Sequence, residues 1–209
     1  MPIRYEVHQG DCISSIAFKH GFFPDTLWND PANAELKKKR GDPNVLLPGD
    51  IVTIPDKRTK EVSRATGEVH KFRRKGVPEK LKLQLLIEGE PRANEPYKIE
   101  IDALTFAGAT DSKGRIECSI PPDARQGRLL LKDGAEVYEL QLGHLDPLDQ
   151  ISGLQGRLHH LGFYRGAIDG QMSASTELAI LEFQLSQNLE TTGEPDAATL
   201  NALQQTYGG

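Results

Sequence analysis

The fold of this chain is decided by two linked stretches, Tyr5-Glu-Val-His-Gln-Gly-Asp-Cys-Ile-Ser-Ser-Ile-Ala-Phe-Lys-His-Gly21 and Asn44-Val-Leu-Leu-Pro-Gly-Asp-Ile-Val-Thr-Ile-Pro55. Near the start, Tyr5 and Val7 alternate with polar residues. Near the end, Ile51–Ile54 is rich in β-branched side chains. Both patterns suit a pleated, half-buried surface, so we expect a short strand at each end of this region.

Helices are predicted between these two strands. Gly10-Asp11 is expected to supply a turn and a helix cap, and Ile13, Ile16 and Ala17 then recur at helical spacing until Gly21 can end the helix. A second helix is expected at Asp25, with Leu27 and Trp28 after it. A turn is expected at Leu47-Pro48-Gly49-Asp50. The order strand, helix, helix, strand predicts a small closed unit.

Three spacings in this region resemble the lysin-motif (LysM) family: Y-x-V-x-x-G-D, I-A-x-x-x-G and P-N-x-L-x-P-G-D-x-V-x-I-P. The resemblance implies a groove between two loops that binds chitin or peptidoglycan through N-acetyl groups. The positions that it assigns to the two groove walls are Gly10, Asp11, Cys12 and Ile13, and Asn44, Val45 and Leu46. The chain is longer than the family pattern between Trp28 and Asn44. The alternative interpretation is that these loop residues only form turns.

The composition excludes several classes of function. The net charge of −5 argues against a general nucleic-acid binder. No apolar run is long enough to span a membrane. The first residues lack a positively charged region followed by an apolar stretch, so we expect synthesis in the cytoplasm without a secretory signal peptide.

No catalytic centre, metal site or cofactor is predicted. Cys12 and Cys118 fall in different expected domains, and two cysteines make no metal framework, so we interpret both as free thiols. His159 and His160 are adjacent, so they would face different sides of a helix and not share a metal ion. No pair of carboxylates sits in a domain that could form a lysozyme-like cleft. The sequence therefore predicts a protein that is not an enzyme.

Residues 57–75 carry eight basic residues against two acidic ones. One interpretation is a solvated linker that leads into an edge strand. The other is a patch that meets an anionic surface, such as a wall polymer or the acidic face of a partner protein.

From about Lys80 to Leu142 the pattern predicts strands throughout. Leu81, Leu83, Leu85 and Ile87 alternate along one half-buried strand. The other expected strands lie at 97–101, 115–120, 128–132 and 136–142. Short strands at this spacing predict an antiparallel sandwich or a small barrel. The piece Gly108-Ala-Thr-Asp-Ser-Lys-Gly-Arg-Ile116 resembles a hairpin of immunoglobulin-like and carboxypeptidase-regulatory-like modules, and it is expected to form a turn rather than bind metal.

The last 60 residues or so are predicted to be helical. One helix face carries Ile151, Leu154, Leu158 and Leu161. A second helix is expected after Ser173, and its apolar residues cover so wide an arc that we expect it to be sandwiched between other elements. A weak internal repeat links two turns to the helices that follow them. Gly170 precedes Thr176 by the same interval that separates Gly193 from Thr199.

The pattern from Leu154-Gln155 through Asp169-Gly170 to Leu203 resembles the peptidoglycan-binding domain found beside bacterial cell-wall hydrolases. The resemblance covers residues 148–209 and implies that wall fragments are held near the turn and the first two helices. By position it assigns this role to Gln155, Tyr164, Asp169 and Gly170. The alternative is that the apolar members of the pattern only build the core.

The sequence as a whole predicts a multidomain α+β protein. Its expected parts are a βααβ LysM unit (1–56), a basic linker (57–75), a central antiparallel β sandwich (76–146) and a C-terminal three-helix peptidoglycan-binding unit (147–209). We expect a non-catalytic bacterial cell-wall protein whose partner is peptidoglycan or another N-acetylated glycan. The alternative is a peptidoglycan hydrolase with an unrecognised site in the β module.

A further expectation comes from the order of the modules together with the missing export signal. In both respects the chain resembles accessory proteins encoded beside type VI secretion spikes and other contractile, phage-tail-like injection systems. The resemblance implies association with a spike or effector protein and delivery to the periplasm or cell wall.

Overall fold

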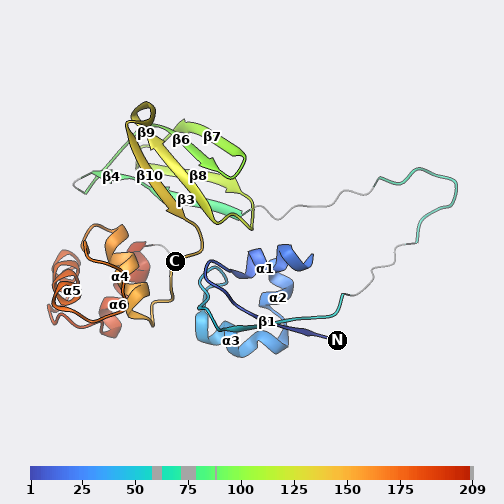
Figure 1. Ribbon diagram of the computed structural model, residues 1–209, viewed down its shortest axis with the longest axis horizontal. Coiled ribbons are helices and arrows are strands. Elements are labelled where there is room, and N and C mark those ends of the chain that lie inside the picture. The colour runs from blue at the N-terminus through green and yellow to red at the C-terminus, as the bar shows by residue number, and fades with distance from the viewer. Residues whose placement is uncertain (58–62, 72–78, 88, 208–209) are drawn as a thin grey trace.

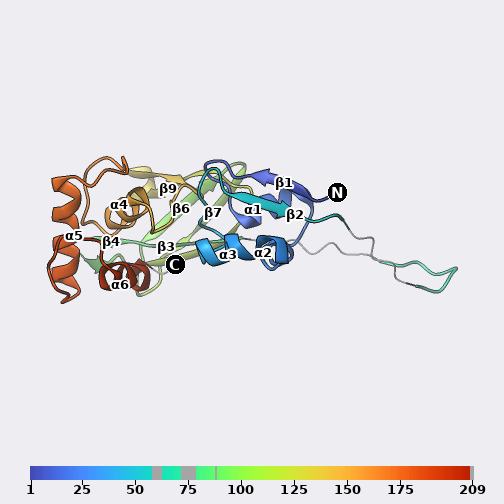
Figure 2. The same cartoon turned by 90° about the horizontal axis from the view of Figure 1, so that it is seen from below.

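The computed structural model of the chain describes residues 1–57, 63–71, 79–87 and 89–207 (Figure 1). The protein mixes helices and strands, and its buried hydrophobic residues fall into three separate clusters. Three units follow from these clusters: an N-terminal unit (residues 3–54), a β unit (79–141) and a C-terminal unit (151–207). Seen from below, the N-terminal and C-terminal units lie toward opposite ends of the body formed by the three units (Figure 2).

The N-terminal unit closes two strands over its helices. Strands β1 (Ile3–Glu6) and β2 (Ile51–Ile54) pair antiparallel, with Tyr5 opposite Val52. Between them lie α1 (Ile13–His20), α2 (Pro24–Trp28), the 3-10 turn η1 (Pro31–Asn33) and α3 (Ala34–Arg40). The buried core of this unit consists of Val7, Ile13, Ile16, Ala17, Leu27, Trp28, Leu46, Val52 and Ile54.

The turn chemistry of this unit follows the sequence with one correction. Gly21 adopts a left-handed conformation after α1 (φ 74°), and Gly49 does so in the turn before β2 (φ 88°), as predicted. The prediction that Gly10-Asp11 caps α1 was wrong, because Cys12 is the capping residue. Its thiol accepts from the Ser15 amide, and the Ser15 hydroxyl accepts from the Cys12 amide, which forms a reciprocal capping box.

The longer segment between Trp28 and Asn44 forms η1 and α3, which were not predicted. Asn33 ties this segment to the rest of the unit. Its buried amide donates to the carbonyls of Leu27 and Thr53, both at 2.8 Å, and accepts from the Thr53 amide at 2.7 Å. The insertion is therefore built into the fold of the unit.

The β unit contains one four-stranded sheet and two short ribbons. The sheet has the order β10 (Glu136–Gln141), β9 (Gln126–Leu131), β6 (Pro96–Ile101) and β7 (Leu104–Ala109), all antiparallel. One ribbon pairs β3 (Glu79–Gln84) with β8 (Arg115–Ile120), and the other pairs β4 (Leu86–Ile87) with β5 (Glu90–Pro91). A 3-10 turn, η2 (Lys132–Gly134), joins β9 to β10.

The sheet and the β3–β8 ribbon share one hydrophobic cluster. Ile99, Ile101, Leu129 and Leu131 of the sheet are buried with Ile116 of the ribbon. An antiparallel sandwich or a small barrel was predicted, and among the described residues the structure shows a four-stranded sheet and this two-stranded ribbon around one core.

Three local predictions about the β unit have clear outcomes. The expected continuous strand from Leu81 to Ile87 is broken at Leu85, whose amide donates to Gly114 and whose carbonyl accepts from Arg92. Strand β7 was not predicted. Asp111 shapes the following turn as expected, because its carboxylate accepts from the amides of Lys113 and Arg115, both at 2.8 Å.

The C-terminal unit consists of α4 (Ile151–His160), α5 (Ala174–Ser186) and α6 (Ala197–Tyr207). Its core is made of Leu154, Leu158, Tyr164, Ala179, Ile180, Phe183 and Leu203. The prediction that α5 is covered on all sides was wrong. Leu178 and Leu185 keep 56% and 70% of their surface exposed, and α5 lies at the outer end of the molecule (Figure 2).

The structure describes only part of the basic segment at 57–75. Lys57, Arg64 and Lys71 are within the described ranges. The remaining basic residues of the segment lie outside the described residues: Arg58, Lys60, Arg73, Arg74 and Lys75. Both interpretations of this segment therefore stay predictions.

Candidate functional site

The loop between α4 and α5 is organised around the side chain of Gln155. The Gln155 carbonyl oxygen accepts from the amides of Asp169 (3.1 Å) and Gly170 (2.9 Å). Its amide nitrogen lies within donating distance of the Asp169 carboxylate, the Gln171 carbonyl and the Thr176 hydroxyl, at 2.9, 3.0 and 3.1 Å. The turn at Asp169-Gly170 is thus held from inside by one side chain without exposed surface.

The same arrangement recurs between α5 and α6, around Gln184. Its carbonyl oxygen accepts from the Gly193 amide (3.0 Å), and its amide nitrogen donates to the Glu194 carbonyl (3.0 Å) and the Thr199 hydroxyl (2.8 Å). The repeat that the sequence shows as glycine and threonine is therefore a repeat of turns, each locked by a buried glutamine from the preceding helix. Sequence reasoning gave the glycines and threonines of this repeat and missed the locking role of the two glutamines.

The four residues of the C-terminal unit that were predicted to contact a ligand differ in how far they are buried. Gln155 and Tyr164 are buried, and the Tyr164 hydroxyl donates to the Ala167 carbonyl at 2.7 Å. Asp169 lies at the surface and Gly170 is half-buried. The side chains of Ile168 and Met172 are exposed beside them. A ligand that reaches this turn would meet Asp169, Gly170 and these apolar neighbours, while Gln155 and Tyr164 hold the turn from beneath.

The N-terminal unit carries a surface pocket of about 350 Å³. It lies between the start of α1, the start of α2 and the loop before β2. The residues that line it are Ser14, Phe23, Pro24, Asp25, Pro43, Asn44 and, from β3 of the β unit, Glu79. The Ile13 amide donates to the Pro43 carbonyl at 2.9 Å, which joins the two sides of the pocket. The Asp42 carboxylate accepts from the Asn44 amide at 2.7 Å and fixes the loop there.

The seven residues predicted to line a groove in this unit also differ in how far they are buried. Asn44 is exposed and lines the pocket, and Val45 next to it is half-buried. Ile13 and Leu46 are core residues, and Cys12 is the half-buried helix cap.

Gly10 and Asp11 are buried beneath the β unit. The Arg125 guanidinium donates to the Asp11 carboxylate at 2.5 Å, and the Gly10 carbonyl lies against Gly143. Neither residue is open to a ligand in this arrangement, because the contact between the two units covers both.

Comparison with known families finds a match in the C-terminal part of the chain. Residues 148–203 match the family described as "Putative peptidoglycan binding domain". The chain carries a peptidoglycan-binding domain.

Curated proteins match the chain over limited stretches. "Localization factor PodJL" of Caulobacter vibrioides is 30% identical over 105 residues, which is 49% of this chain and 11% of that protein. "Putative OxPP cycle protein OpcA" of Synechococcus elongatus is 45% identical over 47 residues, 22% of this chain and 11% of that protein. The chain thus spans about a tenth of the length of these relatives. No solved structure matches it.

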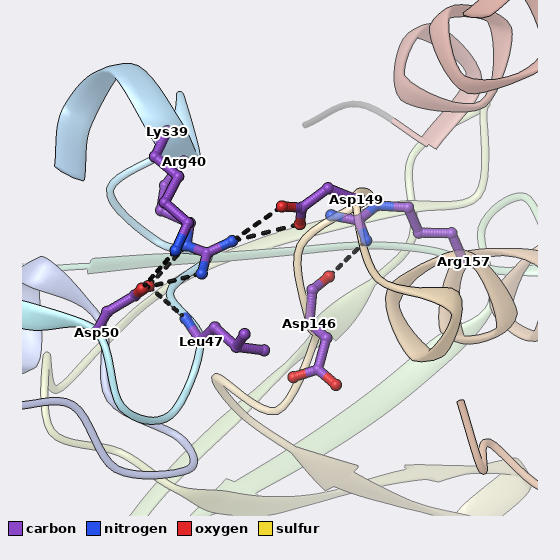
Figure 3. A network of polar contacts seen from close by, with 7 residues as sticks. All are labelled: Lys39, Arg40, Leu47, Asp50, Asp146, Asp149 and Arg157. Atoms are coloured by element: carbon purple, nitrogen blue, oxygen red, sulfur yellow. Dashed lines mark hydrogen bonds and ion pairs between the residues drawn. The ribbon is translucent and has the colours of Figure 1, made fainter. Parts of the chain in front are cut away.

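An ion-pair network joins the peptidoglycan-binding domain to the N-terminal unit (Figure 3). Arg40, at the end of α3, makes two hydrogen bonds to the Asp50 carboxylate (2.6 and 2.9 Å) and reaches both carboxylate oxygens of Asp149 (3.2 and 3.3 Å). The Arg40 side chain is 1% exposed. Burial alone would raise the pKa of Asp50, but hydrogen bonds from Arg40 and from the Leu47 amide hold it below its ordinary value.

The segment between β10 and α4 is also fixed by hydrogen bonds. Arg157 of α4 is buried and donates to the carbonyls of Asp146 (2.7 Å) and Gly153 (2.9 Å). The Ser152 hydroxyl donates to the Asp146 carboxylate at 2.6 Å. The entry to the peptidoglycan-binding domain is therefore tied to its first helix.

The two cysteines and the His159–His160 pair are the side chains that the sequence offered for catalysis or metal binding. Burial raises the pKa of both Cys12 and Cys118, whereas a nucleophilic thiol needs a lowered pKa. His159 contacts the Tyr164 carbonyl, while His160 stacks on Tyr207 of α6. Within the described ranges, no three His, Cys, Asp or Glu side chains gather as a metal site would require, and no helix there is both long and apolar enough to cross a bilayer.

Proposed function

We propose that this chain is a non-catalytic cell-wall protein that binds peptidoglycan through two unlike modules. The observation that carries the proposal is the peptidoglycan-binding domain at residues 148–203, whose surface turn at Asp169-Gly170 is held rigid from within. A turn that is already ordered loses little entropy when a ligand binds.

The N-terminal unit is proposed to be the second module, of the LysM type. Its support is the order of strand, helices and strand, together with a pocket lined by Ser14 on one side and Pro43 and Asn44 on the other. The β unit, which we propose to be an immunoglobulin-like sandwich, would then act as the spacer. Two weak sites in one chain act at high effective concentration on a repeating polymer, so the gain is avidity.

Sedimentation with purified wall sacculi tests this proposal. We expect the chain to pellet with sacculi, and soluble N-acetylglucosamine oligomers to reduce the pelleted fraction by competing for the N-terminal pocket. Substituting Asn44→Ala should weaken this competition, whereas Asn201→Ala, at an exposed position on α6, should not. If the chain stays in the supernatant while a known wall binder pellets, the proposal fails.

A hydrolase remains the competing interpretation, and gel zymography decides between the two. Wall material embedded in a gel should show no clearing at the position of this chain. A clearing band would replace the binding function with catalysis.

The place of action is a separate part of the proposal. The order of a LysM-type unit, a small β unit and a peptidoglycan-binding domain supports an accessory role in a type VI or other contractile injection system, with the chain made in the cytoplasm and delivered to the wall. Affinity capture from a native lysate should then recover spike or effector proteins. Recovery of wall fragments alone would contradict this role and leave wall binding intact.

A further inference from the structure

The pocket on the N-terminal unit is completed by a residue from another unit. Six of its lining residues belong to the N-terminal unit, and the seventh is Glu79, the first residue of β3. Glu79 is close enough to Cys12 for its charge to contribute to the raised pKa of that thiol, after burial and alongside hydrogen bonds that oppose it. The β unit is therefore part of the site.

The polar groups in the pocket point to a ligand. Ser14 is 4% exposed and lines the pocket, yet no described residue forms a hydrogen bond with its hydroxyl. A hydroxyl that lines a pocket and has no hydrogen-bond partner among the described residues is available to a polar ligand. The exposed ring of Phe23 beside it offers an apolar surface that fits the face of a sugar ring.

The charged side chains among the described residues that line the pocket are acidic. Asp25 lies on the wall from α2 and Glu79 on the wall from β3. Two carboxylates in one pocket favour a cationic ligand, and a primary ammonium group can donate to a carboxylate oxygen.

We propose that this composite pocket binds a wall ligand that carries a free primary amine. The inference rests on the proposed function, because it takes the pocket to be the wall-binding site of the N-terminal unit. The amine could belong to a de-N-acetylated glucosamine of the glycan or to the diamino acid of a stem peptide. Both present the same ammonium group, and Glu79 is the residue that selects it.

Calorimetric titration of the full chain with matched ligands tests the inference. One pair is tetrameric glucosamine against tetrameric N-acetylglucosamine. The other pair is a muropeptide with a free diamino-acid amine against the same muropeptide with that amine acetylated. We expect one amine ligand to bind at least about tenfold more tightly than its acetylated match, and the pair that shows the difference identifies the source of the amine.

Two variants assign the preference to the pocket. Glu79→Gln should reduce the preference for the amine to about twofold or less. Glu139→Gln makes the same change of net charge on β10, away from the pocket, and should leave the preference intact. Equal binding of amine and acetylated ligands, or a preference that survives Glu79→Gln, overturns the inference while wall binding stands. Failure to bind any of the four ligands or sacculi overturns both.

Discussion

Gln155 and Gln184 are the residues on which the peptidoglycan-binding domain depends most directly. Each has no exposed surface and satisfies backbone groups of a turn that joins two helices. Leucine fills a similar volume but leaves those groups buried without partners. We expect Gln155→Leu and Gln184→Leu each to lower the free energy of unfolding of this domain by about 2–4 kcal/mol, as measured by urea denaturation.

Gln204→Leu is the matched control for these variants, because Gln204 is exposed on the surface of α6. It should change stability by less than about 0.5 kcal/mol. Equal losses in all three variants would contradict the locking role of the buried amides.

The sequence could not show that Gln155 faces inward. Its position in a family pattern made it a candidate for ligand contact, and a polar residue on an otherwise apolar face is compatible with either role. Only the path of the loop at 166–170, which brings the Asp169 and Gly170 amides to the Gln155 oxygen, decides the matter. Asn44 differs because it lies in an exposed loop and lines the pocket, but its role in binding a glycan stays a prediction.

Asp50 provides a prediction about pH. Its folded-state pKa is held below the ordinary value of 3.8 by Arg40 and Leu47 despite the opposing effect of burial. A carboxyl of this kind stabilises the fold at pH values above its unfolded pKa, and the contribution is lost as pH falls through the folded pKa. The ion pair should therefore stabilise the protein fully above about pH 4 and progressively less below it.

Urea denaturation of the wild type and Asp50→Asn across pH tests this. We expect the variant to be less stable by about 1–3 kcal/mol near neutral pH, because the buried Arg40 side chain then keeps only Asp149 as a charged partner. The difference should shrink below about pH 4. Asp133→Asn, at an exposed position outside any described ion pair, should follow the wild type at every pH. A difference that does not change with pH would rule out the ionised pair as its cause.

At the scale of elements, α5 shows how a helix with apolar residues on more than one face is used. Ile180 and Phe183 face the core without exposed surface, whereas Leu178 and Leu185 project outward. Ile180→Ala should therefore destabilise the domain by about 2–5 kcal/mol, because it leaves a cavity. Leu185→Gln should change stability by less than about 0.5 kcal/mol, since nothing described packs against that leucine. Thermal denaturation of the two variants compares them directly, and a large loss for Leu185→Gln would mean that the outer face is covered in solution.

Elements with strong periodicity were predictable, and elements made by pairing or by insertion were not. The β-branched run at Ile51–Ile54 forms β2 over the residues that were expected. Strand β7 contains Ala107-Gly108-Ala109, which has little intrinsic preference for strand, and it is extended because β6 pairs with it along its whole length. Helix α3 carries no fully buried apolar residue, so it has no apolar stripe for the sequence to show.

The arrangement of the whole molecule depends on contacts that join distant parts of the chain. Arg125 meets Asp11, the Gln9 side chain donates to the His144 carbonyl, and Arg40 meets Asp149. Each pair is separated by more than 100 residues. Local sequence patterns hold no information about such pairs. The sequence could therefore suggest the units but not that the first wall of the predicted groove lies under the β unit.

Gly143 is the position at which this arrangement can be tested with least ambiguity. A Cβ atom there would lie 2.6 Å from the Gly10 carbonyl oxygen, a backbone atom that cannot move aside as a flexible side chain could. Gly143→Ala should therefore separate the N-terminal unit from the β unit, and small-angle scattering should show a larger radius of gyration. Gly134→Ala has the same left-handed strain, but its nearest neighbour is Leu130 at 3.8 Å, so this variant should stay compact.

If the proposed function is right, separation of the two units also uncovers Gly10 and Asp11 but removes Glu79 from the pocket. Gly143→Ala should then keep its binding to acetylated glycan and lose its preference for the free amine, whereas a preference that persists after scattering shows the units to be separated would contradict the role of Glu79.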